Sequence, residues 1–264
     1  MAERTILLTG AAGRIGRAVV QGLSDEPGLY LTDIIPGEEA QARLGDICGE
    51  RYHQANLASR EEVGRLFASL LPIDAIVHLA ASWRDSDDIL RNMIRATTVL
   101  MEVAIEQGLS RYVYASSSAV TEFHELARPE AGHPAYWERS SPPTIDESTD
   151  LRAPNLYGVA KIWTEYHARF LHDVHGIRTI GLRIGNFTTR EGFDDLGECP
   201  RRRALLDCDA VQLVRLALDT EAVECEVFNA ISWPPETPGV WLDVSKAQEM
   251  LGYRPSLGRD HGQR

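Results

Sequence analysis

Lysine is nearly absent from this sequence, and several familiar signals are missing altogether. Two of the 27 basic residues are lysine, Lys161 and Lys246, and arginine supplies the rest. No run of about 18 apolar residues occurs, so the sequence predicts no membrane-spanning helix. The N-terminal segment MAERTILLTG has no basic start, apolar core or small-residue cleavage site, so we expect no signal peptide.

Cysteine and positive charge are also scarce. The four cysteines, Cys48, Cys199, Cys208 and Cys225, form no C-x-x-C pair and no cluster with metal-ligand spacing. We therefore expect no metal site, no disulfide framework and a reduced, cytoplasmic location. The net charge of −12 argues against nucleic acid as a partner, because phosphate binding needs a basic surface.

Alternating strands and helices define the fold class. The 264 residues, of which 44% are hydrophobic, suit one α/β domain spanning 1–264. Strands are predicted at 4–9, 29–33, 74–80, 111–115, 178–184 and 225–230, and helices at 14–24, 59–71, 86–108, 155–175, 208–220 and 244–251. This alternation predicts a Rossmann-type, doubly wound parallel sheet with helices on both faces.

A polar, proline-rich stretch covers residues 121–154. A loop of this length inside a compact domain is usually functional. Together with 186–207 and 231–264, we expect it to form a small substrate-binding portion.

A glycine-rich turn, TGAAGRIG, lies between the first strand and the first helix. Gly10 suits the tight turn, Gly13 lets backbone approach a pyrophosphate, and Gly16 lets helix and strand pack closely. The helix that follows directs free N–H groups and its positive dipole end at the phosphates. In this strand–turn–helix context the motif predicts a dinucleotide site.

Asp33 ends the second strand, 17 residues after Gly16. A carboxylate there accepts hydrogen bonds from the adenosine ribose and repels a 2′-phosphate, which favours NAD over NADP despite Arg14 nearby. His78, in an apolar strand, is interpreted as a core residue. The predicted cofactor-binding residues are Gly10, Ala12, Gly13, Arg14, Ile15, Gly16, Asp33, Ile34, Asn56, Leu57, Leu79, Ala80, Ala81, Asn92, Ala115, Tyr157, Lys161, Ile184 and Asn186.

Tyr157 and Lys161 begin the helix that follows the long loop, four residues apart and therefore on one helical face. Three serines, 116–118, end the fifth strand. A free tyrosine is a poor base with a pKa of about 10, and a neighbouring ammonium lowers that pKa. A serine hydroxyl can orient the substrate oxygen and stabilise developing charge. This set predicts a hydride-transfer site.

These motifs, in this order, resemble the extended short-chain dehydrogenases/reductases of the NAD-dependent epimerase/dehydratase family. The matching stretches are TGAAGRIG, the strand-ending Asp33, HLAA, YASSS, NLYGVAK and RIGN. Asn92 also matches, at a position that in this family supports the lysine through water or helps order the site. LRAPNLYGVAK, LRIGNFT and LGYRP give a closer resemblance to uronate dehydrogenases and to NAD-dependent sugar dehydrogenases of haloarchaea.

The resemblance implies roles for individual residues. Ser117 matches the catalytic serine, Tyr157 the base and Lys161 its partner. A one-residue shift in the serine run would make Ser118 the catalytic hydroxyl instead. Asn186 matches a position near the nicotinamide.

The uronate enzymes also carry an arginine beyond the RIG strand that binds the substrate carboxylate, and this chain has no clean match. Arg201, Arg202, Arg203 and Arg190 are candidates for an anion site, because arginine binds carboxylate or phosphate in a bidentate manner. A solvated arginine run is the alternative. The predicted substrate-binding residues are Ser82, Ser117, Ser118, Ala119, Tyr157, Asn186, Phe187, Arg201 and Arg202.

The leading functional hypothesis is oxidation of a small cyclic sugar or sugar acid at C1 to a lactone, with NAD as acceptor. A nucleotide-sugar epimerase or dehydratase is the alternative, although the 78 residues after Asn186 leave little room to hold a nucleotide. A non-catalytic NAD-binding regulator is a third reading, disfavoured because Tyr157 and Lys161 are both present. Helices 86–108 and 155–175 often form a dimer interface in this fold class, so we expect a homo-oligomer.

Overall fold

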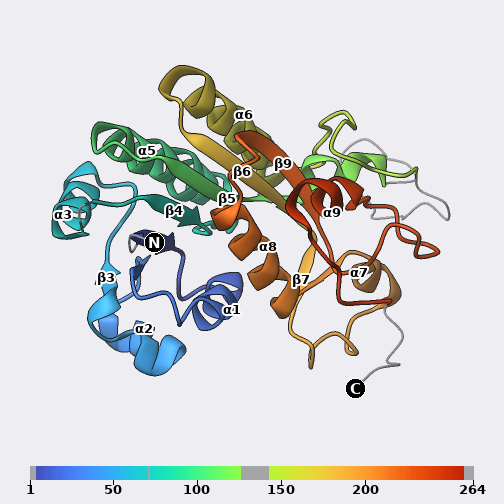
Figure 1. Cartoon of the computed structure of the whole chain (residues 1–264), viewed down its shortest axis with the longest axis horizontal. Helices are drawn as coiled ribbons and strands as arrows, with labels where there is room; N and C mark the ends of the chain where they lie inside the picture. The colour runs from blue at the N-terminus through green and yellow to red at the C-terminus, as the bar shows by residue number, and fades with distance from the viewer. Residues whose placement is uncertain (1–3, 71, 126–142, 259–264) are drawn as a thin grey trace.

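Seven parallel strands form the central sheet of the computed structural model, which describes residues 4–70, 72–125 and 143–258 (Figure 1). Their order is β3-β2-β1-β4-β5-β6-β9, so the predicted Rossmann-type sheet is confirmed. The chain builds outward from β1 to β3 and then returns to place β4 on the other side of β1. The bounds are β1 (Ile6–Thr9), β2 (Leu29–Asp33), β3 (Tyr52–Gln54), β4 (Ala75–His78), β5 (Arg111–Ser117), β6 (Arg178–Ile184) and β9 (Cys225–Ala230).

Helices cover both faces of the sheet. α3, α5 and α6 pack on one face, and α1, α8 and α9 pack on the other (Figure 1). Within the described ranges, none of the helices combines the length and apolarity that a bilayer crossing requires. The bounds are α1 (Arg14–Gly22), α2 (Gly37–Leu44), α3 (Arg60–Leu70), α4 (Ser86–Ile89), α5 (Ala96–Glu106), α6 (Leu156–His175), α7 (Glu198–Arg202), α8 (Asp207–Asp219) and α9 (Ser245–Leu251).

Consecutive residues of each strand contribute to opposite cores, which explains why the strands read as continuous apolar runs. In β1, Ile6 and Leu8 pack against the α1 and α8 side, whereas Leu7 packs against the α3 and α5 side. In β5, Tyr112 and Tyr114 face the second side with stacked rings, 5.2 Å between centroids. Side chains alternate in this way along any strand, and a parallel sheet covered on both faces buries every one of them.

Two features depart from the sequence-based prediction. Helix α2 was not predicted, because its eight residues bury two side chains, Ala40 and Leu44, and so carry a weak apolar pattern. The single helix predicted over 86–108 is divided: a π-helical segment, Leu90–Arg95, joins α4 to α5. Apolar periodicity does not distinguish a short π segment from α-helix, although such segments are common at functional sites.

The segments assigned to the substrate-binding portion meet beyond the carboxyl ends of β5, β6 and β9. The strand β7 (Asn186–Thr188) pairs with β8 (Ala204–Leu206). Ile145 forms an isolated parallel bridge with Leu242. Residues 126–142 and 259–264 of this portion lie outside the described residues, and its role in binding substrate stays a prediction.

His78 lies in the core, as predicted, and is held there by two hydroxyl groups. Its Nδ1 is 2.7 Å from the Thr9 hydroxyl on β1, and its Nε2 is 3.0 Å from the Thr97 hydroxyl on α5. Burial, together with the charges of Lys161 and His167, lowers the pKa of His78 to about 3. The ring is therefore neutral in the folded protein at neutral pH.

Acid should weaken the fold through His78. In the unfolded chain this residue is protonated below about pH 6.5. In the folded chain it stays neutral down to about pH 3. Between about pH 7 and about pH 4.5, the free energy of unfolding should fall about 2–3 kcal/mol more in the wild type than in His78→Gln. Urea unfolding of both proteins measures this, and equal losses would show that His78 does not cause it.

Candidate active site

A cleft opens at the carboxyl ends of β1 and β4, where the strand order reverses. Parallel α/β sheets bind their ligands at such a switch point. The cleft has an adenosine half of about 400 Å³ and a catalytic half of about 350 Å³. Both halves are lined by Gly10, Gly13, Leu79 and Ala81, so they form one continuous depression.

The glycine-rich turn adopts a backbone that side chains would forbid. Gly10 has a φ of 69°, and a Cβ there would lie 2.6 Å from the backbone nitrogen of Ala80. A Cβ on Gly16 would lie 2.1 Å from the carbonyl oxygen of Gly10. Helix α1 starts directly after the turn, with no side chain bonded to its first N–H groups. These N–H groups and the open backbone surface fit the pyrophosphate of a dinucleotide.

Asp33 ties the glycine-rich turn to the end of β2. Its carboxylate accepts hydrogen bonds from the backbone N–H of Ala12 at 3.0 Å and of Ile34 at 2.8 Å. Arg43, on α2, donates to the carbonyl oxygen of Ala12 at 3.4 Å and pairs with Glu39. Arg43 lines the adenosine half, and sequence reasoning missed it because α2 itself was missed.

Asn92 lies in the π-helical segment and lines the adenosine half of the cleft. Its side-chain amide donates to Asp88 at 2.7 Å. Hydrogen bonds from Ser82, the Arg84 backbone and Asn92 lower the pKa of Asp88. Ser82, predicted to contact substrate, thus lies with Asn92 on the cofactor side.

The catalytic half brings together Ser117 from the end of β5 with Tyr157 and Lys161 from the first turns of α6. Asn155 begins this helix, and its side-chain oxygen accepts the Gly158 N–H at 2.9 Å. That cap fixes the register of the first turn. Tyr157 and Ser117 line the same half of the cleft, and Ser117 lies near enough to the phenol to lower its pKa.

Lys161 is buried, 4% exposed, and its ammonium donates to the carbonyl oxygen of Ala115 at 2.6 Å. The ammonium lies 5.8 Å from the centre of the Tyr157 ring. Burial lowers the pKa of Lys161 to about 8, while the negative charge of Glu165 raises it. Burial also raises the pKa of Tyr157, and the hydrogen bond with Ser117 lowers it. In general a positive charge beside a phenol favours the phenolate, and the Lys161 ammonium is the cation that lies near the Tyr157 ring.

Trp83 is a cleft residue that the sequence reasoning missed. Its ring packs edge-on against Tyr157, with 5.9 Å between centroids, and it is 66% exposed. It lines the catalytic half just after the HLAAS stretch that closes β4. The sequence feature that could have indicated Trp83 is its position directly after the HLAAS stretch.

Most of the predicted site residues line this cleft. The adenosine half is lined by Gly10, Gly13, Asp33, Ile34, Asn56, Leu57, Leu79, Ala80, Ala81, Ser82 and Asn92. The catalytic half is lined by Gly10, Gly13, Arg14, Ile15, Gly16, Leu79, Ala81, Ala115, Ser117, Tyr157, Lys161, Ile184, Asn186 and Phe187.

Three predicted residues lie beside the cleft. Ala12 bonds Asp33 through its backbone. Ser118 and Ala119 are buried in a short 3₁₀ turn, in which the Ser118 carbonyl accepts the Thr121 N–H at 3.1 Å. Ser117 lines the cleft together with Tyr157 whereas Ser118 does not, so Ser117 stays the preferred candidate for the catalytic hydroxyl.

The arginine run is engaged elsewhere. Arg201 donates to the Asp194 carbonyl at 2.8 Å and lies over the Phe193 ring, and Arg202 pairs with Glu198. Neither Arg201 nor Arg202 lines either half of the cleft.

The next two arginines differ in their surroundings. Arg203 forms 3.2 Å ion pairs with both Glu122 and Glu125, whereas Arg190 is exposed. The backbone of Arg203 adjoins the cleft, because its carbonyl accepts the Asn186 N–H at 2.7 Å.

The model of the NAD dependent epimerase/dehydratase family matches residues 6–200. The chain belongs to this family. It is 29% identical over 258 residues to an NAD-dependent glucose-6-phosphate dehydrogenase from Haloferax volcanii, covering 96% of this chain and 93% of that protein. It is 28% identical over 257 residues to a uronate dehydrogenase from Pseudomonas syringae pv. tomato, covering 95% of this chain and 81% of that protein.

Among solved structures, a mutant uronate dehydrogenase from Agrobacterium tumefaciens complexed with NAD is similar, with a TM-score of 0.71 and 25% identity. The match covers 96% of this chain and 84% of that one. Family, fold and glycine-rich cradle agree that this chain is an enzyme whose cofactor is NAD.

Removing the Asp33 carboxylate should weaken NAD binding. In Asp33→Ala, the Kd for NAD should rise about tenfold or more, because hydrogen bonds to a charged group are lost, and the preference for NAD over NADP should narrow. Isothermal titration calorimetry with both dinucleotides measures this. Glu38→Ala, which removes an exposed carboxylate on α2, is the matched control. An unchanged Kd in Asp33→Ala would contradict the assignment.

Proposed function

We propose that this enzyme oxidises a small cyclic sugar or sugar acid at C1 to its lactone, with NAD as the acceptor. The observation that carries the proposal is the convergence of Ser117, Tyr157 and Lys161 in the half of the cleft beyond the glycine-rich turn. A hydroxyl, a phenol and an ammonium in one water-poor site can remove a proton from an alcohol while its carbon loses a hydride.

Each side chain has a distinct task in this reaction. Bound NAD supplies the hydride acceptor. Ser117 donates a hydrogen bond to the substrate oxygen and orients it. Tyr157 takes the proton of the C1 hydroxyl, and Lys161 stabilises the phenolate that this transfer requires. The electron pair of the C1–H bond leaves with the hydride, and the C1–O bond becomes the lactone carbonyl.

The relatives support a sugar as the substrate. The glucose-6-phosphate and uronate dehydrogenases match this chain along nearly its whole length. Their two named substrates are sugars that carry an anionic group, a phosphate or a carboxylate. In this chain the arginine whose backbone adjoins the cleft, Arg203, already pairs with Glu122 and Glu125. Because the positive charge of Arg203 is already balanced by these two acids, neutral sugars should be tested as substrates as well as anionic ones.

The first test is a substrate panel with a matched pair of variants. NADH formation is followed with hexoses, pentoses, uronic acids and sugar phosphates.

Tyr157→Phe should keep NAD affinity within about threefold and lose about a thousandfold or more in kcat, because it removes the base and leaves the ring. Tyr30→Phe makes the same change on β2, at a residue that lines neither half of the cleft, and should leave kcat unchanged.

Two outcomes would contradict the proposal. Near-normal kcat in Tyr157→Phe would remove Tyr157 as the base. Sugar conversion with no net release of NADH would assign an epimerase reaction instead, in which the reduced cofactor returns its hydride within the same site.

We also propose that the enzyme is a dimer formed through α6. Four apolar side chains at helical spacing, Val159, Tyr166, Phe170 and Val174, are 48–68% exposed along this helix. Their spacing places them on one face, and Leu90 of the π-helical segment is also exposed. A stripe of this kind marks an interaction surface, and a helix face that meets its own copy about a twofold axis is self-complementary.

If the enzyme is a dimer formed through α6, a charged residue placed in that interface should reduce the mass of the particle in solution. Light scattering should give about twice the chain mass for the wild type and the single-chain mass for Phe170→Glu, because a buried, unpaired carboxylate opposes association. Met250→Glu, at an exposed apolar position on α9, should remain a dimer. A monomeric wild type at micromolar concentration would refute the dimer.

A further inference from the structure

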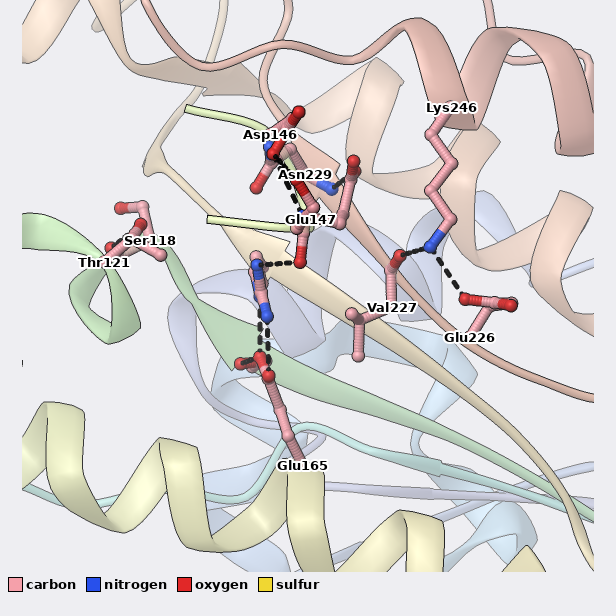
Figure 2. Close-up of polar contacts among 12 residues, drawn as sticks. Ser118, Thr121, Asp146, Glu147, Glu165, Glu226, Val227, Asn229 and Lys246 are labelled. Atoms are coloured by element: carbon pink, nitrogen blue, oxygen red, sulfur yellow. Dashed lines mark hydrogen bonds and ion pairs between the residues drawn. The ribbon is translucent and has the colours of Figure 1, made fainter. Parts of the chain in front are cut away.

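A buried ion pair lies behind the catalytic residues, between helix α6 and the sheet. Arg183 on β6 donates to both oxygens of Glu165 on α6, through Nε and Nη2, each at 2.9 Å. The Ser116 hydroxyl on β5 donates to Glu165 at 2.5 Å. Figure 2 shows the Glu165 side chain extending from α6 toward the sheet. Glu147 lies on the opposite side of the Arg183 guanidinium that Glu165 binds.

Each member of this cluster adjoins a residue of the catalytic half. Ser116 precedes Ser117, Arg183 precedes the segment from Ile184 to Asn186, and Glu165 follows Lys161 by one helical turn. The side chains of Glu165 and Arg183 are 7% and 3% exposed. Burying such a pair costs desolvation free energy, and apolar residues of similar volume often stabilise a core as well or better. Stability alone therefore gives a weak reason for charges at this place.

The charge of Glu165 acts on Lys161. Burial lowers the pKa of Lys161, and the Glu165 carboxylate is the group that opposes this effect. The other titratable groups near the ammonium are Tyr157 on the same helix and His78 on β4, which is neutral. Arg183 on β6 binds the Glu165 carboxylate, and its positive charge offsets part of the effect of that carboxylate. Glu165 is thus the negative charge that faces Lys161 among the described residues.

The cluster is also anchored from the far side. Arg183 Nη1 lies 3.5 Å from the carbonyl oxygen of Glu147, and the Glu147 carboxylate accepts the Asn229 N–H at 2.6 Å (Figure 2). The amide of Asn229 donates to the carbonyls of Ile145, at 3.1 Å, and Asp243, at 2.9 Å. Glu165 and the Glu147 carbonyl therefore contact the Arg183 guanidinium directly, and Asn229 holds the segment that carries Glu147.

We propose that Glu165 is a positioning residue whose carboxylate, clamped by Arg183 and Ser116, keeps the Lys161 ammonium charged and in place beside Tyr157. This role rests on the proposed function, because it assigns a task to Glu165 in the reaction that Tyr157 and Lys161 perform. Without Glu165, Lys161 loses its proton at a lower pH and no longer supports the phenolate.

The two lysines of the chain allow a direct test in the absence of substrate. In protein labelled with carbon isotope at lysine, NMR resolves Lys161 and Lys246, and each signal titrates with its own side chain. Glu165→Gln should lower the pKa of Lys161 below its wild-type value. Glu226→Gln removes the partner of Lys246, 2.7 Å away, and should leave Lys161 unchanged.

Enzyme kinetics give the second readout. In Glu165→Gln, kcat at about pH 8 should fall about tenfold while the KM for the sugar changes less than about threefold. The alkaline limb of the kcat/KM profile should move to lower pH. A role confined to folding would lower the amount of active protein without moving that limb.

A second variant guards against misfolding, since Glu165→Gln leaves Arg183 without its buried charge partner. Glu165→Gln/Arg183→Gln removes both charges and should regain thermal stability. The pKa of Lys161 should then lie between its values in Glu165→Gln and in the wild type, because loss of the Arg183 positive charge partly offsets loss of the Glu165 negative charge. An unchanged Lys161 titration in folded Glu165→Gln would overturn the proposal. A shifted titration in an enzyme that oxidises no sugar would support this role of Glu165 and refute the proposed reaction.

Discussion

The burial of one ammonium group organises the catalytic half of the cleft. Lys161 donates to the carbonyl oxygen of Ala115, so helix α6 must lie directly against the end of β5. Ser117 is two residues beyond Ala115, and Tyr157 is one turn before Lys161. A single contact between helix and strand therefore brings the phenol to the serine. The same burial lowers the pKa of Lys161, and the Glu165 carboxylate at the next turn of α6 raises it.

The parallel sheet explains why residues from distant parts of the chain meet. All seven strands end at the same edge, so the turn after β1, the end of β2 and the ends of β5 and β6 face one cleft. The inner strands β1, β4, β5 and β6 are buried on both faces, so their polar side chains reach solvent mainly at that edge. Buried polar groups behind the edge, such as His78 and Arg183, are each satisfied by neighbours from other elements.

Local chemistry made most of the fold and half of the site predictable from sequence. Apolar runs gave the strands to within a few residues, and the spacing of Tyr157 and Lys161 placed both on one face of α6. Arg43 was not predictable, because its contact with Ala12 depends on how a weakly patterned helix folds back over the turn. The arginine run was also beyond sequence reasoning. Folding brings Glu122 and Glu125 to Arg203 and places Arg201 over the Phe193 ring, and sequence spacing does not show either contact.

The hydrogen bonds of Asp33 and Arg43 to Ala12 have a consequence for how the cofactor binds and dissociates. Its N–H is held by Asp33 and its carbonyl by Arg43, so the two peptide groups that flank Ala12 are both anchored before any dinucleotide binds. A loop that is already ordered loses little conformational entropy when it closes on a ligand. Exchange of the spent cofactor then involves breaking contacts with a rigid cradle rather than unfolding and refolding it. Such a cradle suits an enzyme that releases its reduced cofactor after every turnover.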